Sequence, residues 1–265
     1  MNCKIVCLLF IIMFCVIVRN VYNENMSNKN NNNNIYHIPK IIHQTWYKKD
    51  IPEPIKKHID KMRSIHPSYK YNFYDDDDID DYLKKNATRR EIQAYNKLSI
   101  GAEKADFFRY IILYYDGGIY VDLDSAIIKN IDKLIKNKSA IITREENSGL
   151  FVQWCLMFSP KHPILKKTIE LCVDNINSEK YNNNIHSKTG PMVYSNVIKN
   201  ILNSKKIYNI DDKSINNKLK KYKNPYIKRT YFYKIDYDDY AIFTIPEKEL
   251  MYKEKKHWKE EQVDR

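Results

Sequence analysis

From about residue 35 onward, short apolar runs alternate with segments in which apolar residues recur every three or four positions. Short runs predict buried strands, and the recurring pattern predicts helices that pack one face on a core. Such alternation of strands and helices predicts an α/β fold with a mostly parallel central sheet flanked by helices. The predicted strands are 38–46, 69–76, 119–123, 139–143, 149–160 and 240–246, and the predicted helices are 51–66, 77–85, 91–98, 102–115, 162–175 and 189–202.

Two weaker segments complete the pattern. Residues 127–136 are expected to form a strand edge followed by a short helix, and residues 203–236 are expected to be loop-rich and basic. Thr189 lies near the expected N-cap of the helix over 189–202, with Pro191 in its first turn, where proline is favoured. No internal repeat is visible in the sequence.

The N-terminal 34 residues differ in composition from the rest of the chain. Its apolar run, residues 5–18, is closed by Arg19 and is shorter than the ~20 residues of an independent membrane span. No small-residue cleavage site follows, so we favour an uncleaved signal-anchor over residues 1–22 against a cleaved signal peptide. The polar, asparagine-rich stretch 23–34 is expected to be a stem, and residues 35–265 are expected to form one folded domain.

Composition narrows the function classes. The formal net charge is +12, and 43 % of the residues are hydrophobic, which excludes wholesale disorder. The lysines are scattered, and no zinc-finger spacing or RNA-binding aromatic motif is visible, so we do not expect nucleic acid as a partner. Of the five cysteines, Cys155 and Cys172 lie in the folded part. They are expected either to form one disulfide or to remain as buried thiols.

The chain has only five glycines, and Gly117 and Gly118 stand side by side between two apolar runs. Glycine tolerates the positive φ that ends a helix, so the pair predicts a helix, a tight turn and a strand. Asp122 and Asp124 follow, and residues two apart in a strand point to the same side. Ligands of α/β sheets gather at such strand ends, although an isolated D-x-D can also be a plain acidic loop.

The preceding helix adds Asp106 and Arg109, which share one face at i,i+3 spacing. They could be an ordinary intrahelical ion pair, but the apolar neighbours of Arg109 suggest a buried guanidinium with a dedicated anionic partner. The two carboxylates of Asp122 and Asp124 suit a hard cation, Mn²⁺ or Mg²⁺, whose shell nucleotide phosphates usually complete. This combination points to transfer chemistry in which a diphosphate departs.

At this point the sequence resembles glycosyltransferase family 32, the sugar transferases with a D-x-D motif. Within that family it looks most similar to the initiating α-1,6-mannosyltransferase of fungal N-glycan outer chains and to inositol-phosphoceramide mannosyltransferases. The resemblance rests on IPKIIHQTW (38–46), HPSYKYNFYDDDD (66–78), AEKADFFRYIILYYDGGIYVDLDS (102–125), VQWCLMFSPKHP (152–163) and TGP (189–191).

The resemblance implies a single-domain GT-A fold, a nucleotide-sugar donor, dependence on Mn²⁺ and retention of anomeric configuration. By position, it implies that Asp106 and Arg109 contact the donor sugar and diphosphate. It further implies that Asp122 holds the ribose or the metal and that Asp124 ligates the metal. Trp46 matches a position where an aromatic ring stacks on the nucleotide base; the alternative is a tryptophan of the core.

Other residues carry weaker predictions. Gln153-Trp154 resembles the mannosyltransferase branch and favours GDP-mannose as the donor. His257-Trp258 lacks the serine of the family pattern, so His257 is interpreted as part of a solvated tail. The acidic run 75–81 is interpreted as a solvated loop and helix start, with its first residues as candidates to line the donor pocket. His43 is interpreted as a histidine of the core.

These inferences combine into a type II membrane enzyme of the Golgi or endoplasmic reticulum lumen that transfers mannose from GDP-mannose to a glycan or glycolipid acceptor. An alternative is a galactosyl- or N-acetylhexosaminyltransferase that uses a UDP-sugar, because the same D-x-D core serves both nucleotides. An alternative of another class is a catalytically silent, membrane-anchored binding protein. Donor binding that depends on Mn²⁺ would separate the enzymes from that protein.

Overall fold

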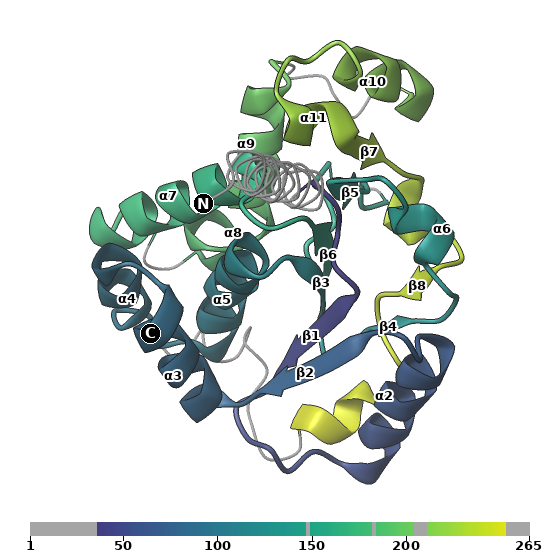
Figure 1. Ribbon diagram of the computed structural model, residues 1–265. Helices are drawn as coiled ribbons and strands as arrows, with labels where there is room; N and C mark the ends of the chain where they lie inside the picture. Colours follow the sequence, from purple (N-terminus) through teal and green to yellow (C-terminus); the bar gives the residue numbers. More distant parts are fainter. Residues whose placement is uncertain (1–35, 147–148, 182–183, 204–210, 253–265) are drawn as a thin grey trace, which may run out of the picture. The chain divides into compact units, whose positions relative to one another are not determined.

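A six-stranded sheet organises the fold (Figure 1). The computed structural model describes residues 36–146, 149–181, 184–203 and 211–252, and those from His37 onward form one compact unit. The predictions for the signal-anchor 1–22, the stem 23–34 and His257 lie outside the described residues. Within the described ranges, every helix is too short or too polar to cross a membrane.

The strand order of the sheet is β2-β1-β3-β6-β5-β7. β6 runs antiparallel to its neighbours β3 and β5, and the other pairings are parallel. The predicted mostly parallel sheet is therefore confirmed. Its strands are β1 (Ile41–Thr45), β2 (Lys70–Tyr74), β3 (Gly118–Val121), β5 (Ala140–Ile142), β6 (Cys155–Phe158) and β7 (Thr230–Phe232).

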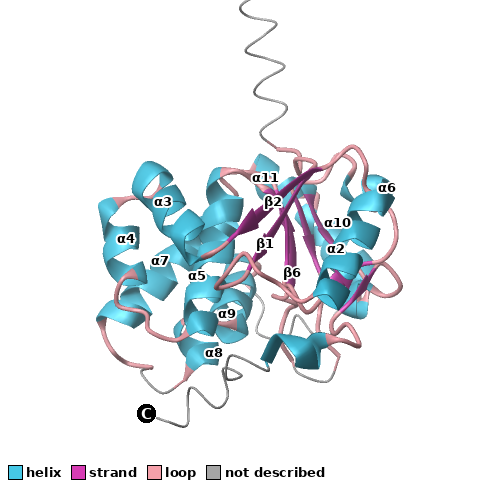
Figure 2. Ribbon diagram, turned by 90° about the horizontal axis from the view of Figure 1, so that it is seen from below, coloured by secondary structure: helices cyan, strands magenta, loops and turns pink. Residues whose placement is uncertain are grey.

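Helices cover both faces of the sheet, which gives three layers (Figures 1 and 2). Successive strand residues point to opposite faces of the sheet and contribute to two hydrophobic cores. Tyr120 and Phe158 pack with α5 and α7, whereas Ile119 and Met157 pack with α2 and α6. The described helices are α2 (Glu53–Ile65), α3 (Asp76–Asn86), α4 (Arg89–Tyr95), α5 (Gly101–Tyr115), α6 (Asp132–Ile135), α7 (Pro163–Asn177), α8 (Ile185–Lys188), α9 (Pro191–Ile201), α10 (Asp212–Leu219) and α11 (Pro225–Arg229).

The turn between α5 and β3 has the predicted glycine geometry. Gly117 and Gly118 have φ of 69° and 104°, and a Cβ on Gly118 would lie 2.6 Å from the carbonyl oxygen of Ile41 in β1. Side chains rarely tolerate such φ values, and here a neighbouring strand also fills the space. The glycine pair therefore lets the chain leave α5 and enter the sheet directly beside β1.

We expect Gly118→Ala to destabilise the protein by about 2–4 kcal/mol, because it adds a steric clash to the strain of a positive φ. Gly149→Ala is the matched control: Gly149 has a φ of 68°, but no atom lies within 4 Å of an added Cβ. That substitution should cost only about 1 kcal/mol. Urea unfolding followed by circular dichroism measures both, and equal losses would contradict the close approach of β1.

Several predicted boundaries are wrong. β3 ends at Val121 rather than at residue 123, so the D-x-D lies in the following turn. The run 149–160 forms a strand only over β6, because its first half is a buried loop that bridges back to Arg144. A continuous apolar run shows that a segment is buried, but it does not show that the segment is paired in a sheet.

The C-terminal half also differs from the prediction. The stretch 203–236, expected to be loop-rich, contains α10, α11 and β7. α10 was missed because it buries only Ile215 and Leu219, too few apolar positions to reveal a helical period. The predicted strand 240–246 is reduced to β8 (Ala241–Ile242), which pairs with β4 (Ala126–Ile127) in a separate two-stranded sheet.

The two cysteines of the folded part are buried free thiols, so the alternative of a disulfide between Cys155 and Cys172 is wrong. Each belongs to a different hydrophobic cluster, on opposite faces of the sheet.

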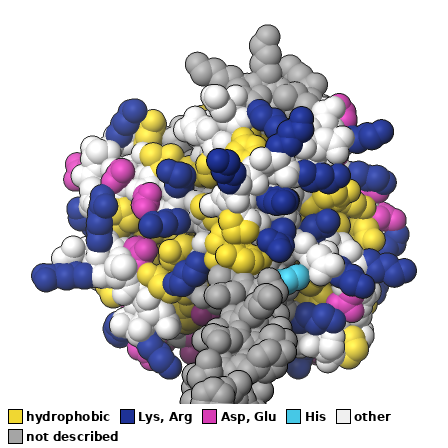
Figure 3. All heavy atoms as spheres, turned by 45° about the horizontal axis from the view of Figure 1, so that its top comes forward, with side chains coloured by type: hydrophobic (Ala, Val, Ile, Leu, Met, Phe, Trp, Pro, Cys, Tyr) yellow, Lys and Arg dark blue, Asp and Glu magenta, His cyan; other side chains and the backbone are white. Residues whose placement is uncertain are grey.

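The basic side chains are spread over the face drawn in Figure 3 among hydrophobic patches, rather than gathered in one stripe.

Candidate active site

A cavity of about 450 Å³ opens where β1 and β3 end. Its wall combines the end of β1, the first turns of α5, the turn after β3 and the loop before β6. The segment after β8 completes the wall with Phe243, Thr244, Lys248 and Met251. Ligands of open α/β sheets bind at this edge, so the cavity stands where the fold predicts a site.

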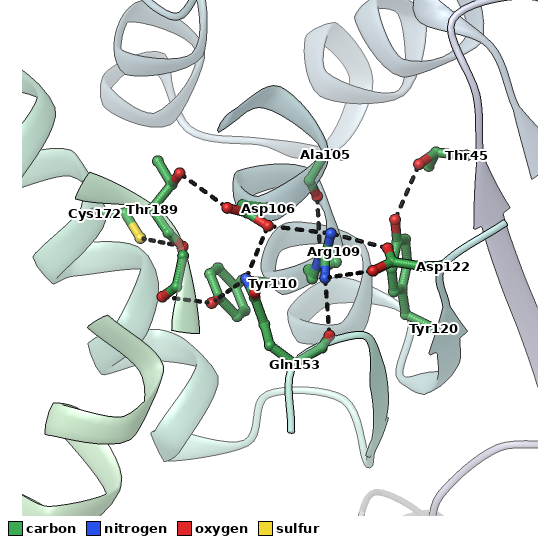
Figure 4. Close-up of polar contacts among 11 residues, drawn as sticks. Thr45, Ala105, Asp106, Arg109, Tyr110, Tyr120, Asp122, Gln153, Cys172 and Thr189 are labelled. Atoms are coloured by element: carbon green, nitrogen blue, oxygen red, sulfur yellow. Dashed lines mark hydrogen bonds and ion pairs between the residues drawn. The ribbon is translucent and has the colours of Figure 1, made fainter. Parts of the chain in front are cut away.

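Arg109 lies at the centre of a buried polar network (Figure 4). Its Nη2 lies 3.1 Å from Oδ1 of Asp106 and 2.9 Å from Oδ1 of Asp122, and its Nη1 donates to Oδ2 of Asp122 at 3.3 Å. Nη1 also donates to the carbonyl oxygen of Gln153 at 2.9 Å, and the guanidinium lies 4.8 Å from the ring centroid of Tyr120. The predicted dedicated anionic partners are therefore present.

The charge of Arg109 is fixed by these carboxylates. Burial alone would lower the pKa of the guanidinium, but the negative charges of Asp122 and Asp106, together with the neighbouring tyrosines, outweigh this effect and raise the pKa above its ordinary value. The side chain is only 6 % exposed. The intrahelical ion pair with Asp106 is present, but it is not an ordinary one, because it is buried and Arg109 is also paired with Asp122 from another element.

Asp106 bridges α5 to two other parts of the wall. Its Oδ1 accepts from Nε2 of Gln153 at 3.0 Å, and its Oδ2 accepts from the hydroxyl of Thr189 at 3.3 Å. Burial raises its pKa to about 6, although Arg109 opposes the shift. As predicted, Thr189 lies beside the N-cap of α9, which is Gly190, and Pro191 is in the first turn. The Thr189 hydroxyl donates to Asp106 and does not cap the helix.

The backbone of the D-x-D turn is held from both sides. The amide of Asp122 donates to the carbonyl oxygen of Trp154 at 2.8 Å, and the carbonyl oxygen of Asp122 accepts from Nε2 of Gln44 at 3.2 Å. The carbonyl oxygen of Asp124 accepts from the amide of Ile245 at 2.8 Å. The two carboxylates were predicted to lie on one side because residues alternate along a strand, but they do not belong to a strand. The turn nevertheless brings both of them to the cavity.

The electrostatics of this turn fit a cation. Burial raises the pKa of both carboxyls, and the charge of Asp122 helps to raise that of Asp124 to about 6. A hard divalent ion would relieve this repulsion, since carboxylate oxygens are its preferred ligands. Among the described residues, no group of three or more potential metal ligands is present. The two aspartates would therefore need substrate oxygens to complete a coordination shell.

Trp46 follows directly after β1, is half-buried and lines the cavity. Its ring lies 5.1 Å from the ring of Tyr47, which also lines the cavity. Trp46 also packs against the hydrophobic cluster around Leu123, so base stacking by Trp46 stays a prediction beside the alternative of a core tryptophan. The interpretation of the acidic run is confirmed: Asp75 is the N-cap of α3 and forms a capping box with Asp78, while Asp76 lines the cavity.

His43 is the predicted core histidine. It is fully buried, its Nε2 lies 3.0 Å from the carbonyl oxygen of Gly117, and burial lowers its pKa to about 4. Sequence reasoning missed the contacts of Thr189 and the place of Phe243 in the cavity wall. No local pattern could have revealed them, because each meets the site only through the tertiary fold.

Comparisons with known proteins agree with this geometry. Residues 52–141 match the family described as "Glycosyltransferase sugar-binding region containing DXD motif". An uncharacterized glycosyltransferase of Acanthamoeba polyphaga mimivirus is 41 % identical over 96 residues, which are 36 % of this chain and 38 % of that protein. The initiation-specific alpha-1,6-mannosyltransferase of Schizosaccharomyces pombe is 30 % identical over 199 residues, covering 63 % of this chain and 50 % of that protein.

Mannosyl phosphorylinositol ceramide synthase CSH1 of Saccharomyces cerevisiae is 36 % identical over 134 residues, which are 50 % of this chain and 35 % of that protein. The chain thus spans about half or less of the length of these relatives. Among solved structures, PaToxG glycosyltransferase superposes with a TM-score of 0.54 at 21 % identity, over 77 % of this chain and 83 % of that one.

The structural match confirms the predicted GT-A fold. The matched sequence region includes α5 and the D-x-D turn, the two elements that bring Asp106, Arg109 and Asp122 together. Residues 52–141 therefore match the DXD-containing sugar-binding region of glycosyltransferases, and the predicted resemblance to glycosyltransferase family 32 is confirmed.

Proposed function

We propose that this protein is a retaining glycosyltransferase that transfers mannose from GDP-mannose to a glycan or glycolipid acceptor. The observation that carries the proposal is the buried Asp106–Arg109–Asp122 network, which faces a cavity beside a second carboxylate, Asp124. Among the similar proteins are an initiation-specific alpha-1,6-mannosyltransferase and an inositol phosphoceramide mannosyltransferase, and both support mannose as the sugar.

We assign a role to each of these cavity residues, and its position supports that role. Arg109 is a fixed, buried cation at the cavity wall, suited to pair with the diphosphate as negative charge develops on it. Asp106, anchored by Gln153 and Thr189, is placed to accept a hydrogen bond from a hydroxyl of the donor sugar. Trp46 offers a ring face for the nucleotide base.

Asp122 and Asp124 would hold Mn²⁺, with Mg²⁺ as the alternative, and the bound ion would supply positive charge to the departing diphosphate. Asp122 also orients Arg109 through two contacts, so it links the cation site to the guanidinium. The buried loop before β6 and the segment after β8 line the cavity beside these groups.

We further propose that the protein is a single-pass type II membrane protein of the Golgi or endoplasmic reticulum, with its GT-A domain in the lumen. The apolar run 5–18 supports an anchor, and the asparagine-rich stretch 23–34 supports a stem. Protease protection of the full chain in microsomes tests this topology: the domain should be protected until detergent is added.

Nucleotide choice is tested by calorimetric titration of GDP and UDP into the full chain in detergent, with Mn²⁺ or with EDTA. We expect GDP to bind in the presence of Mn²⁺ and UDP to bind at least tenfold more weakly. Tighter binding of UDP would favour the UDP-sugar alternative. The absence of any metal-dependent nucleotide binding by the folded protein would leave the silent binding protein.

The Trp46→Ala variant should weaken GDP binding by roughly tenfold or more, because base stacking on an aromatic ring contributes about 1–3 kcal/mol. Tyr47→Ala tests whether the neighbouring ring shares this role. Mn²⁺-dependent calorimetry gives both affinities. An unchanged affinity for GDP in the Trp46 variant would show that the base binds elsewhere in the cavity.

A further inference from the structure

Phe243 is an apolar side chain left in water at the mouth of the cavity. Its side chain is 60 % exposed, more than Ile128, Met192 and Ile235, the other exposed large hydrophobic residues of the described ranges. Of these four, Phe243 alone lines the cavity. Exposing an aromatic ring to water forgoes favourable burial, so its position beside a substrate cavity indicates a ligand contact.

The ring is held in place from both sides of the chain. Phe243 follows β8, which is anchored to β4, and its carbonyl oxygen accepts from the hydroxyl of Ser125 at 2.5 Å. Two residues later, the amide of Ile245 binds the carbonyl oxygen of Asp124. Phe243 is therefore fixed relative to the D-x-D turn and does not lie on an independent loop.

Trp154 extends this surface toward the interior. Its ring centroid lies 5.5 Å from that of Phe243 at an angle of 45°, and it packs in turn on Tyr237 at 5.8 Å. Trp154 is only 5 % exposed, so it supports the Phe243 ring from behind. The aromatic rim, defined as Phe243 and Trp154, belongs to a different part of the wall from Trp46, which packs with the cluster around Leu123.

An aromatic rim of this kind suits a six-membered polyol ring. Such rings carry C–H groups on one face, which pack on aromatic faces and leave water, while their hydroxyls need polar partners around the edge. Glu145 and Thr244 line the same cavity and supply a carboxylate and a hydroxyl. A phosphate or another anionic group alone would gain nothing from the rim.

We propose that Phe243, supported by Trp154, forms an acceptor subsite that receives the C–H face of a six-membered polyol ring, either a pyranose of a glycan or the inositol of a glycolipid headgroup. This inference deepens the proposed function and rests on it. The position of the rim beside the D-x-D turn would place the acceptor ring next to the departing diphosphate.

The test uses the full chain with GDP and Mg²⁺, the diamagnetic alternative to Mn²⁺, and two probes: methyl α-D-mannopyranoside and myo-inositol 1-phosphate. Saturation-transfer NMR detects ring protons in contact with the protein, independently of turnover. We expect one probe to give a signal with the native chain and with Phe243→Tyr, and the signal to fall at least fivefold with Phe243→Ala. Ile235→Ala is the matched control, since it removes a comparably exposed hydrophobic side chain outside the cavity.

The same variants are then assayed for GDP release from GDP-mannose with and without the probe. The ratio of probe-dependent to probe-independent release should fall about tenfold in Phe243→Ala and be restored in Phe243→Tyr. A pyranoside response identifies a glycan acceptor, and an inositol response identifies a glycolipid headgroup. Neither probe contacting the native chain, or equal contact in Phe243→Ala, overturns the subsite. Absence of GDP release from every variant would instead reject the proposed function, while the NMR result still decides the subsite.

Discussion

Asp124→Asn should abolish sugar transfer and at the same time stabilise the metal-free protein at neutral pH. The substitution removes a ligand of the proposed cation site, so we expect nucleoside diphosphate release to fall about a hundredfold or more. It also removes a buried carboxylate that Asp122 repels. Activity and stability should therefore change in opposite directions, as they do when a site stores unfavourable electrostatics for ligand binding.

The sign of the stability effect follows from the pKa. Burial, with the charge of Asp122, raises the pKa of Asp124 to about 6 in the folded protein. The folded state then binds more protons than the unfolded state between about pH 4 and 6, so this group makes stability fall as pH rises through that window. Above pH 6 the cost is complete. Because Asp124 is half-buried, we expect the Asn variant to gain about 1–2 kcal/mol there, or roughly 2–6 °C in Tm.

Differential scanning calorimetry at pH 5 and pH 7, with EDTA or Mn²⁺, measures the Tm of the native chain and of the Asp124→Asn variant. Mn²⁺ should raise the Tm of the native chain at pH 7 and leave the Asn variant unchanged. Asp236→Asn is the matched control, because burial also raises the pKa of Asp236, which lies outside the cavity wall. The Asp236→Asn variant should retain the native rate of sugar transfer within about twofold. A destabilised Asp124→Asn protein would contradict the electrostatic account.

Arg109→Met should produce the largest loss of stability in the site, about 3–5 kcal/mol. Removing the guanidinium leaves two buried carboxylates, Asp106 and Asp122, without their cation, and such uncompensated charges are costly. Transfer should be lost as well, because the fixed positive charge at the cavity wall disappears. Urea unfolding at pH 7 gives the stability change, and a smaller loss is expected at pH 5, where the carboxyls can bind protons.

The chain contains a matched control for this variant. Arg63 pairs with Asp60 at the same i,i+3 spacing and lies over the ring of Tyr71, 5.3 Å from its centroid. Both charged side chains of that pair are more than half exposed. Arg63→Met should therefore change stability by less than about 1 kcal/mol. Equal losses for the two arginines would show that the burial of Arg109 contributes nothing.

The elements that were predicted correctly are those whose backbone is determined by a local sequence pattern. α5, the Gly117–Gly118 turn and β3 follow from one continuous stretch, in which helix periodicity and scarce glycines point to the same backbone. α10 and the short β8 were missed or overextended, because two buried residues or a two-residue pairing leave almost no periodic signal. Both elements depend on contacts with segments that are distant in the sequence.

The same distinction applies to the site. Asp106, Arg109, Asp122 and Asp124 come from one stretch with a readable spacing, and the structure brings them to one cavity. The contact of Thr189 with Asp106 joins residues 83 positions apart, and that of Ser125 with Phe243 joins residues 118 apart. Contacts of this kind depend on how the α8 and β8 regions pack, which no pattern within either segment encodes.

The measurement that tests the central claim most directly is nucleoside diphosphate release by the full chain from GDP-mannose, UDP-galactose and UDP-N-acetylglucosamine. We predict release from GDP-mannose that requires Mn²⁺, stops with EDTA and is lost in Asp124→Asn but kept in Asp236→Asn. Release from a UDP-sugar instead would contradict the choice of donor. A folded protein that releases nothing and binds no donor with Mn²⁺ would contradict the assignment of a transferase site to this cavity.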